Sequence, residues 1–240
     1  MGEAGLDQVL LWSMLAGICT AIGAIMLFIK RRWSSASLAV FLGLASGVMV
    51  AVVVFDMLPS AVAYAGFGST IKGVAGGFLI VYLFDRFAFE KLSQGDTLIG
   101  LGYLIMLGIA MHDLPEGIAI ALGHEMKDRT GMVIALGIGV HNIPEGMAIA
   151  APLIMGGVRR FRILIQTALI GLITPLGTIL GREVVLKLPF MLPLMLGLAS
   201  GIMLYLVLFQ LWPQASVQNR NTRWYGFFLG MLIIFTATFI

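Results

Sequence analysis

Two segments decide how this chain folds: Met111-His-Asp-Leu-Pro-Glu-Gly-Ile-Ala-Ile-Ala121 and Val140-His-Asn-Ile-Pro-Glu-Gly-Met-Ala-Ile-Ala150. Each lies inside a long apolar stretch, and each carries a His, a second polar residue and a Glu. An ionised Asp or Glu at the centre of a bilayer costs roughly 2.5–3.5 kcal/mol on insertion scales. Left bare, Asp113, Glu116 and Glu145 would together cost about 8–10 kcal/mol. A metal cation is the leading candidate to compensate them.

The composition is that of a polytopic membrane protein. Of the 240 residues, 60% are hydrophobic and 11% are charged, and the mean hydropathy is +1.01. A soluble protein of this size needs far more charge to cover its surface. Since no long polar stretch interrupts the apolar segments, we expect a single transmembrane domain over residues 1–240. The first apolar segment is longer than the apolar region of a signal peptide and lacks a basic start, so we expect it to be retained.

The net charge of +3 and the pI near 9.2 could indicate a nucleic-acid partner. The Lys and Arg residues, however, fall mostly in short loops between apolar segments, which membrane topology explains better. We therefore expect a lipid bilayer and no nucleic acid as partner. Cys19 is the single cysteine, which excludes an intrachain disulfide and a thiolate metal cluster.

Eight apolar segments are long enough to cross a bilayer as helices, which predicts an all-α bundle of eight transmembrane helices. The predicted helices are Gln8–Ile29, Leu38–Leu58, Ile71–Phe87, Thr97–Leu122, Gly131–Met155, Ile163–Leu186, Met191–Trp212 and Trp224–Ile240.

Loop charges predict the orientation of these helices. Loops on one side carry ten basic residues, namely Lys30, Arg31, Arg32, Arg86, Lys91, Arg159, Arg160, Arg162, Arg220 and Arg223. Loops on the other side carry five, namely Lys72, Lys127, Arg129, Arg182 and Lys187. Because the more basic side faces the cytoplasm, both termini are expected outside it.

A second pair of segments is also alike. Leu44-Ala-Ser-Gly resembles Leu198-Ala-Ser-Gly, and a Met, a Phe, a Pro and an Ala follow in the same register. In a bundle of eight, the second and seventh helices cross in opposite directions, as do the fourth and fifth. This pattern indicates an inverted repeat, which transporters use with the substrate site at the repeat interface. Chance similarity between apolar helices is the alternative.

Residues i, i+1 and i+4 of a helix share one arc of its surface. His112, Asp113 and Glu116 therefore lie together, and so do His141, Asn142 and Glu145. If the two helices face each other, all six side chains converge. Mixed imidazole and carboxylate ligands suit Zn²⁺, Fe²⁺, Mn²⁺ and similar ions rather than Ca²⁺ or Mg²⁺. The alternative is a self-contained polar network of His–Glu and Asp–Asn pairs that locks the two helices together.

The residues around these ligands refine the prediction. Gly117, Ala119, Gly146 and Ala148 are expected to let the fourth and fifth helices approach closely. Pro115 and Pro144 cannot donate a backbone hydrogen bond, so each helix is expected to kink beside its ligands. Four further polar residues are candidates for the ion pathway, with helix packing or a helix end as the alternative: Asp56, Gln166, Thr174 and Gln210.

The paired His-Asp-Leu-Pro-Glu-Gly and His-Asn-Ile-Pro-Glu-Gly motifs on neighbouring helices resemble the ZIP (zinc- and iron-regulated transporter-like) family, especially its short prokaryotic members. The resemblance implies uptake of a divalent metal toward the cytoplasm, with the ion between the fourth and fifth helices. It further implies a first metal position at His112, Glu116, His141 and Glu145. A second position would use Asp113 and Asn142, bridged by the same two glutamates.

One residue departs from the family pattern. The sixth helix of similar proteins often reads Glu-Pro, whereas this chain has Thr174 before Pro175. A neutral hydroxyl is a poor ligand, which puts a second ion in doubt.

We therefore expect a metal transporter, not an enzyme, in a prokaryotic plasma membrane. No cofactor is expected besides the transported ion, which is zinc first, with iron, manganese, cobalt or cadmium as alternatives. A homodimer is plausible by resemblance. The runner-up is a membrane-embedded metal-dependent hydrolase, because His and Glu also serve catalytic zinc. A non-transporting metal sensor is a third reading, although no signalling domain is evident.

Overall fold

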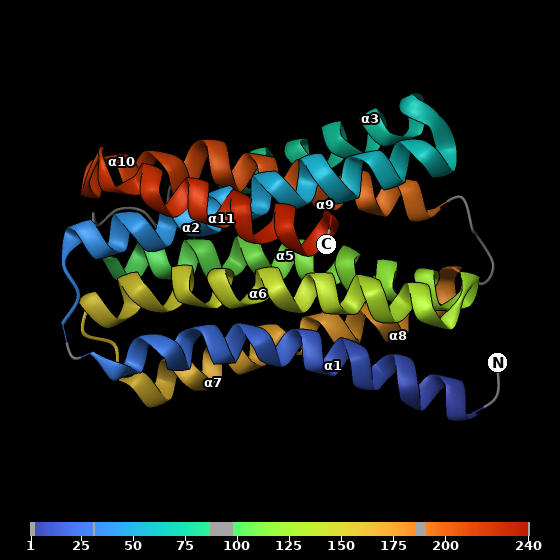
Figure 1. Ribbon diagram of the computed structural model, residues 1–240, viewed down its shortest axis with the longest axis horizontal. Helices are drawn as coiled ribbons and strands as arrows, with labels where there is room; N and C mark the ends of the chain where they lie inside the picture. Colours follow the sequence, from blue (N-terminus) through green and yellow to red (C-terminus); the bar gives the residue numbers. More distant parts are fainter. Residues whose placement is uncertain (1–2, 31, 87–97, 186–190, 240) are drawn as a thin grey trace.

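A computed structural model describes residues 3–30, 32–86, 98–185 and 191–239. Every regular element in these ranges is helical (Figure 1). The elements are α1 (Glu3–Met26), η1 (Leu27–Ile29), α2 (Ser35–Val52), η2 (Val53–Met57), α3 (Leu58–Phe84), α5 (Leu98–Met126), α6 (Asp128–Met155), α7 (Arg160–Gly171), α8 (Ile173–Val185), α9 (Met191–Leu206), η4 (Val207–Leu211), α10 (Trp212–Gln218) and α11 (Thr222–Phe239).

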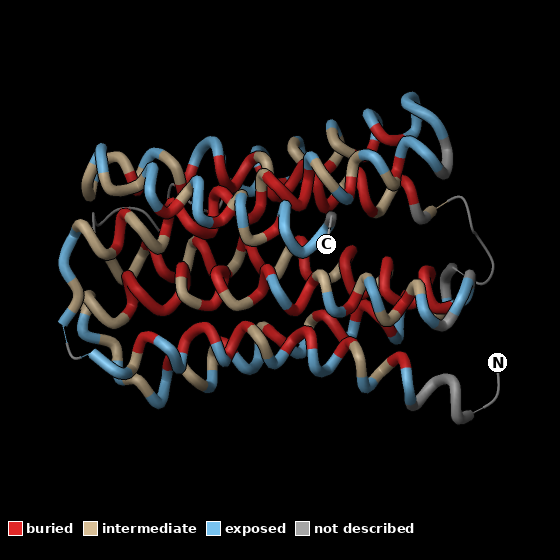
Figure 2. The backbone as a smooth tube through the Cα atoms, in the orientation of Figure 1, coloured by how far each residue is buried: buried red, intermediate tan, exposed pale blue. Residues whose placement is uncertain are grey.

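The helices form two packed groups with α5 and α6 at their junction (Figure 1). In one group α3 packs on α9, and α11 packs on α2. In the other, α1 packs on α6, and α5 packs on both α6 and α8. The groups meet mainly where α5 contacts α9 and α2 contacts α6. Buried residues face these contacts, while exposed ones face outward (Figure 2).

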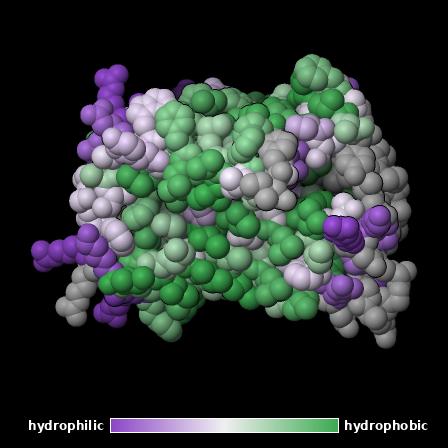
Figure 3. All heavy atoms as spheres, viewed as in Figure 1, coloured by the Kyte–Doolittle hydropathy of each residue, from purple (hydrophilic) through white to green (hydrophobic). Residues whose placement is uncertain are grey.

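Within the described ranges, seven helical stretches are long and apolar enough to span a membrane. They correspond to the first seven predicted helices, although the predicted ends Phe87, Thr97 and Leu186 lie outside the described residues. The eighth predicted stretch forms α11 up to Phe239, its predicted end Ile240 lying outside the described residues, and α11 packs along α2. An eighth span stays a prediction. A hydrophobic band separates the hydrophilic side chains at the two ends of the molecule (Figure 3). At the more basic end, the Arg223 guanidinium lies 4.2 Å from the ring centroid of Trp212.

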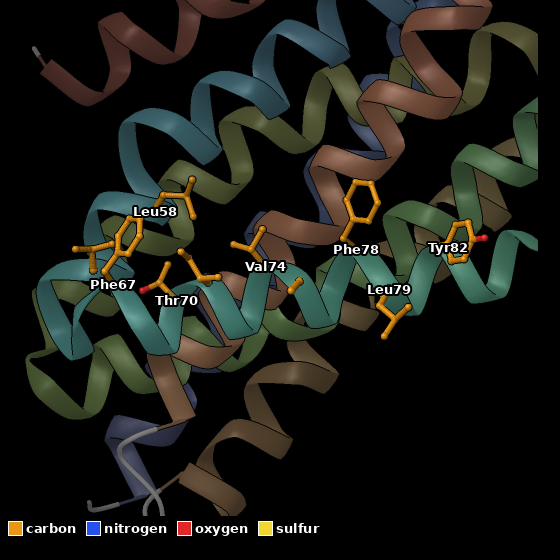
Figure 4. A pocket seen from close by; sticks show the side chains of 10 residues that line it. Leu58, Phe67, Thr70, Val74, Phe78, Leu79 and Tyr82 are labelled. Carbon is orange, nitrogen blue, oxygen red and sulfur yellow. The ribbon is translucent and has the colours of Figure 1, made fainter.

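A large groove opens on the outside of this band, along α3. It has a volume of about 810 Å³, and Leu58, Phe67, Val74, Phe78 and Leu79 are among its apolar lining residues (Figure 4). Its lining includes none of the polar residues of the two motifs. An apolar surface of this kind suits contact with hydrocarbon rather than with an ion.

The repeat segments predicted at Leu44 and Leu198 share an unusual local structure. Each changes from an α-helix to a π-helix at equivalent residues, Val53–Met57 and Val207–Leu211. The N–H of Leu58 donates to the carbonyl of Val53, and the N–H of Trp212 donates to that of Val207. A π turn is rare and is often found at functional sites. The two turns place Asp56 and Gln210 at matching positions.

Two predicted boundaries were wrong. The sixth predicted helix, Ile163–Leu186, is broken at Leu172 into α7 and α8. Pro175 explains the break, because its nitrogen cannot donate to the carbonyl of Gly171. The third helix begins earlier than Ile71, since helical structure continues past Pro59 and turns at Gly66, whose φ of 75° favours glycine.

Candidate metal centre

Two His–Glu pairs connect α5 and α6, and each pair crosses from one helix to the other. The Nε2 atom of His141 lies 3.2 Å from Oε2 of Glu116. The Nε2 atom of His112 lies 3.3 Å from Oε1 and 3.4 Å from Oε2 of Glu145. All four side chains are buried. The two helices therefore bring the predicted His and Glu residues together as the sequence indicated.

Asp113 completes the cluster beside these pairs. Its Oδ1 lies 3.6 Å from Nε2 of His112, too far for a hydrogen bond. Ligand atoms of His112, Asp113 and Glu116 all lie within 4.8 Å of one another, which is close enough to hold a metal ion. The Nδ1 atom of His112 is 3.1 Å from the carbonyl oxygen of Gly108. Such a backbone contact fixes the ring and directs Nε2 toward the cluster.

Several oxygen atoms of this cluster have no hydrogen-bond partner despite complete burial. They are both carboxylate oxygens of Asp113, Oε1 of Glu116, Oδ1 of Asn142 and Oε1 of Glu145, whose 3.3 Å contact with His112 lacks hydrogen-bond geometry. Buried polar atoms are almost always partnered in native proteins. An arrangement with five unpartnered oxygens around two imidazoles is thus incomplete as a polar network and electron-rich.

Asn142 differs from its repeat counterpart Asp113 in where it points. Its Nδ2 donates a hydrogen bond of 2.9 Å to the carbonyl oxygen of Ala16 on α1. The Asp–Asn pair that a self-contained network requires is not made. Asn142 instead ties α6 to α1, and its free Oδ1 is the atom left for a ligand role.

The predicted use of the small residues was wrong for two of them. Gly117 lies against α8, where an added Cβ would sit 2.0 Å from the carbonyl oxygen of Thr174. Gly146 lies against α1, where a Cβ would sit 1.9 Å from the carbonyl oxygen of Thr20. The residue after each Glu is rotated by about 100° from the arc of ligands, so it faces a third helix.

The prolines do not interrupt the helices that carry the cluster. Pro115 lies inside α5 and Pro144 inside α6, and both helices continue past them. Packing of the surrounding helices therefore holds the ligand-bearing turns helical despite the missing backbone donors.

The other predicted pathway residues have separate environments. Gln166 on α7 donates from Nε2 to the hydroxyl of Tyr103 on α5, at 3.2 Å. Thr174 is buried, and its Oγ1 has no hydrogen-bond partner. Gln210 is also buried, with both amide atoms unpartnered. Gln166 thus contributes to helix packing, which is the role that its sequence position favoured over the ion pathway.

Asp56 on η2 lies beside the cluster. It is exposed, and it lines a cavity of about 60 Å³ together with Ser60, Glu116 and His141. Ser60 donates from Oγ to Oδ1 of Asp56 at 3.4 Å. The sequence analysis did not single out Ser60, although a hydroxyl four residues after an acid on a helix was a usable signal.

Seven apolar spans around a buried cluster of His, Asp and Glu define a polytopic membrane protein with a cation site, a class that includes metal transporters. The family model described as "ZIP Zinc transporter" matches residues 89–238. The chain therefore belongs to the ZIP family, whose members are transport proteins rather than enzymes.

Curated relatives agree over nearly the whole chain. The zinc transporter ZupT of Escherichia fergusonii is 30% identical over 94% of this chain and 93% of its own length. ZupT of Chlorobium luteolum is 33% identical over 88% of this chain and 89% of its own length. ZupT of Streptococcus mutans is 28% identical over 92% of each. The apolar spans and the bacterial relatives make this chain an integral protein of a prokaryotic plasma membrane.

Proposed function

We propose that this chain transports divalent transition-metal ions, zinc first, through a site between α5 and α6. His112, Asp113, Glu116, His141, Asn142 and Glu145 bind the ion. Family membership and the zinc transporters among its relatives support the activity. The single structural observation that carries the site is the set of buried carboxylate and amide oxygens without partners.

The energetic argument separates a cation site from a structural network. A buried polar atom without a hydrogen bond costs about 1–3 kcal/mol, and more when it is charged. In a network that served only to join α5 and α6, the amide of Asn142 would be expected to donate a hydrogen bond to the carboxylate of Asp113. Here Asn142 reaches Ala16 instead, and Asp113 keeps both oxygens free. A divalent cation bound by His112, Asp113 and Glu116, whose ligand atoms lie within 4.8 Å of one another, compensates the free oxygens of Asp113 and Glu116.

The distances between side-chain atoms also suit a bound ion. Zinc bonds of about 2.0–2.1 Å in a tetrahedron place neighbouring ligand atoms roughly 3.3 Å apart. The contacts between His and Glu across the two helices are 3.2 Å and 3.3 Å. These contacts are long for charge-assisted hydrogen bonds but match the edges of a metal coordination shell.

The resemblance to the ZIP family implies uptake toward the cytoplasm, and the expected topology identifies which end of the molecule that is. With the more basic loops in the cytoplasm, both termini lie outside and uptake runs toward the basic end of the molecule. The matching π turns support an inverted repeat, and transporters with such repeats bind their substrate at the repeat interface. Thr174 contributes no charge beside the cluster, so one ion among the six buried ligands is expected. A homodimer stays a prediction.

Purified protein in proteoliposomes tests the activity. We expect uptake of ⁶⁵Zn²⁺ above that of empty vesicles, reduced by competition from Fe²⁺, Mn²⁺, Co²⁺ or Cd²⁺ to different extents. The order of competition gives the metal preference, which these ligand types alone do not set. The proposal fails if none of these ions enters faster than it enters empty vesicles.

A further inference from the structure

A small cavity lies next to the cluster, on the side of η2. We propose that Asp56, with Glu116 and His141 across the cavity, forms an outer position that an ion occupies before it reaches the six buried ligands. The inference rests on the proposed function. It adds a residue from the other helical group and assigns an order to the ligands.

The cavity provides the space. Its volume of about 60 Å³ exceeds the roughly 10–15 Å³ that one water needs, so it can hold a partly hydrated ion. It joins an exposed carboxylate, that of Asp56, to two buried groups, Glu116 and His141. The cavity therefore connects the surface of η2 with the metal centre.

An unpartnered atom indicates what the cavity would bind. Glu116 is 1% exposed, and its Oε1 has no hydrogen-bond partner, while its Oε2 lies beside His141. Two carboxylates that share one small cavity repel each other unless a cation lies between them. Asp56 itself has one hydrogen bond, from Ser60, which leaves its other carboxylate oxygen available.

The π turn explains why Asp56 is placed there. A π turn holds more residues per turn than an α-helix, so it changes the face on which the following residues lie. Asp56 lies within the turn, and Met57, the next residue, is buried. The turn thus presents one carboxylate at the mouth of the cavity and returns the chain to the core directly afterwards.

Substitution of Asp56 tests the proposal. Asp56→Asn keeps the volume and removes the charge, and Asp56→Glu restores the charge. Glu183→Gln is the matched control, because Glu183 is an exposed carboxylate on α8 that does not line the cavity. Initial rates of ⁶⁵Zn²⁺ uptake are measured against Zn²⁺ concentration. We expect Asp56→Asn to raise KM about tenfold with Vmax changed by less than about twofold.

The control variants decide how that result is read. Asp56→Glu should return KM to within about threefold of the original protein, and Glu183→Gln should leave it unchanged. An unchanged KM in Asp56→Asn would overturn the proposal. So would an equal rise in Asp56→Asn and Glu183→Gln, because general surface charge would then explain both.

A binding measurement separates this proposal from the proposed function. Co²⁺ is titrated into the detergent-solubilised protein, and its ligand-field absorption is followed. We expect a tight and a weaker phase, with the weaker phase lost in Asp56→Asn and kept in Glu183→Gln. An Asp56-dependent phase without any flux would leave the outer position standing and refute transport. Zn²⁺ flux together with a Co²⁺ titration that is the same in Asp56→Asn would refute the outer position and leave transport standing.

Discussion

The His141–Glu116 pair and the His112–Glu145 pair consist of the same residue types on the same two helices, yet their surroundings differ. The first pair lines the cavity that reaches exposed Asp56. His112 and Glu145 are not among the described residues that line it, and both are fully buried. Near-identical sequences therefore give one pair with a route outward and one enclosed pair. The repeat supplies the ligands twice, and the neighbouring helices make the two copies unequal.

Removal of either glutamate charge is expected to have the largest effect. Glu116→Gln and Glu145→Gln each leave a His facing an amide and remove a carboxylate from the metal centre. We expect uptake of ⁶⁵Zn²⁺ to fall at least about 100-fold in both, since a lost ligand weakens both binding and passage. Initial rates in proteoliposomes check this, with Glu183→Gln as the control. Full activity in either variant would show that the two pairs are not both required.

The glycines after the glutamates should affect stability next. Gly146→Ala places a Cβ 1.9 Å from the carbonyl oxygen of Thr20, whereas Gly137→Ala on the same helix places it where no atom lies within 4 Å. We expect Gly146→Ala to lower stability by about 1–3 kcal/mol. Gly137→Ala should be neutral or stabilising, because alanine favours the helix. Thermal unfolding in detergent measures both, and equal melting temperatures would contradict the close contact of α1 with α6.

The difference between Asp113 and Asn142 tests whether the two halves are interchangeable. Asp113→Asn removes a buried charge with two free oxygens, and we expect metal affinity to fall about tenfold. Adding Asn142→Asp restores the total charge but sets a carboxylate against the carbonyl oxygen of Ala16, where Asn142 now donates. The double variant should therefore not recover affinity. Recovery in a Co²⁺ titration would mean that the two positions are equivalent.

The smallest effect is expected outside the cluster, at the contact between α7 and α5. Gln166→Leu and Tyr103→Phe each remove one hydrogen bond and should each cost about 1 kcal/mol. The double variant should cost little more than either single one, because both remove the same bond. Thermal unfolding in detergent checks this. Fully additive losses would place the two side chains in separate interactions.

Much of this architecture is predictable from sequence because lipid leaves few alternatives. The spans are apolar stretches of a length that the bilayer sets. The three polar residues of each motif had to share one arc of their helix, because helical geometry brings positions i, i+1 and i+4 to the same side. These two constraints predicted eight spans, seven of which the described residues show, and the convergence of His112, Glu116, His141 and Glu145.

The remaining features depend on contacts between distant segments, which periodicity does not encode. The sequence places Gly117 and Gly146 beside the ligands, but only the packing shows that they face α8 and α1. In the sequence Asn142 is equivalent to Asp113. In the structure it differs, because it donates a hydrogen bond to the carbonyl oxygen of Ala16, which is 126 residues away in the chain. The π turns were hidden too, because an extra residue in one turn leaves the apolar pattern of a fully apolar helix unchanged.

The matching π turns also bear on the history of the chain. Each turn holds one residue more than an α-helical turn would, as a single inserted codon would produce. Two unrelated insertions would have to fall at Val53–Met57 and Val207–Leu211, which occupy the same register of two similar segments. One insertion in an ancestral half, copied afterwards, accounts for both. Under that account the widened turn is older than the chain that now carries it twice, and the difference between Asp56 and Gln210, the fourth residue of each turn, arose after the duplication.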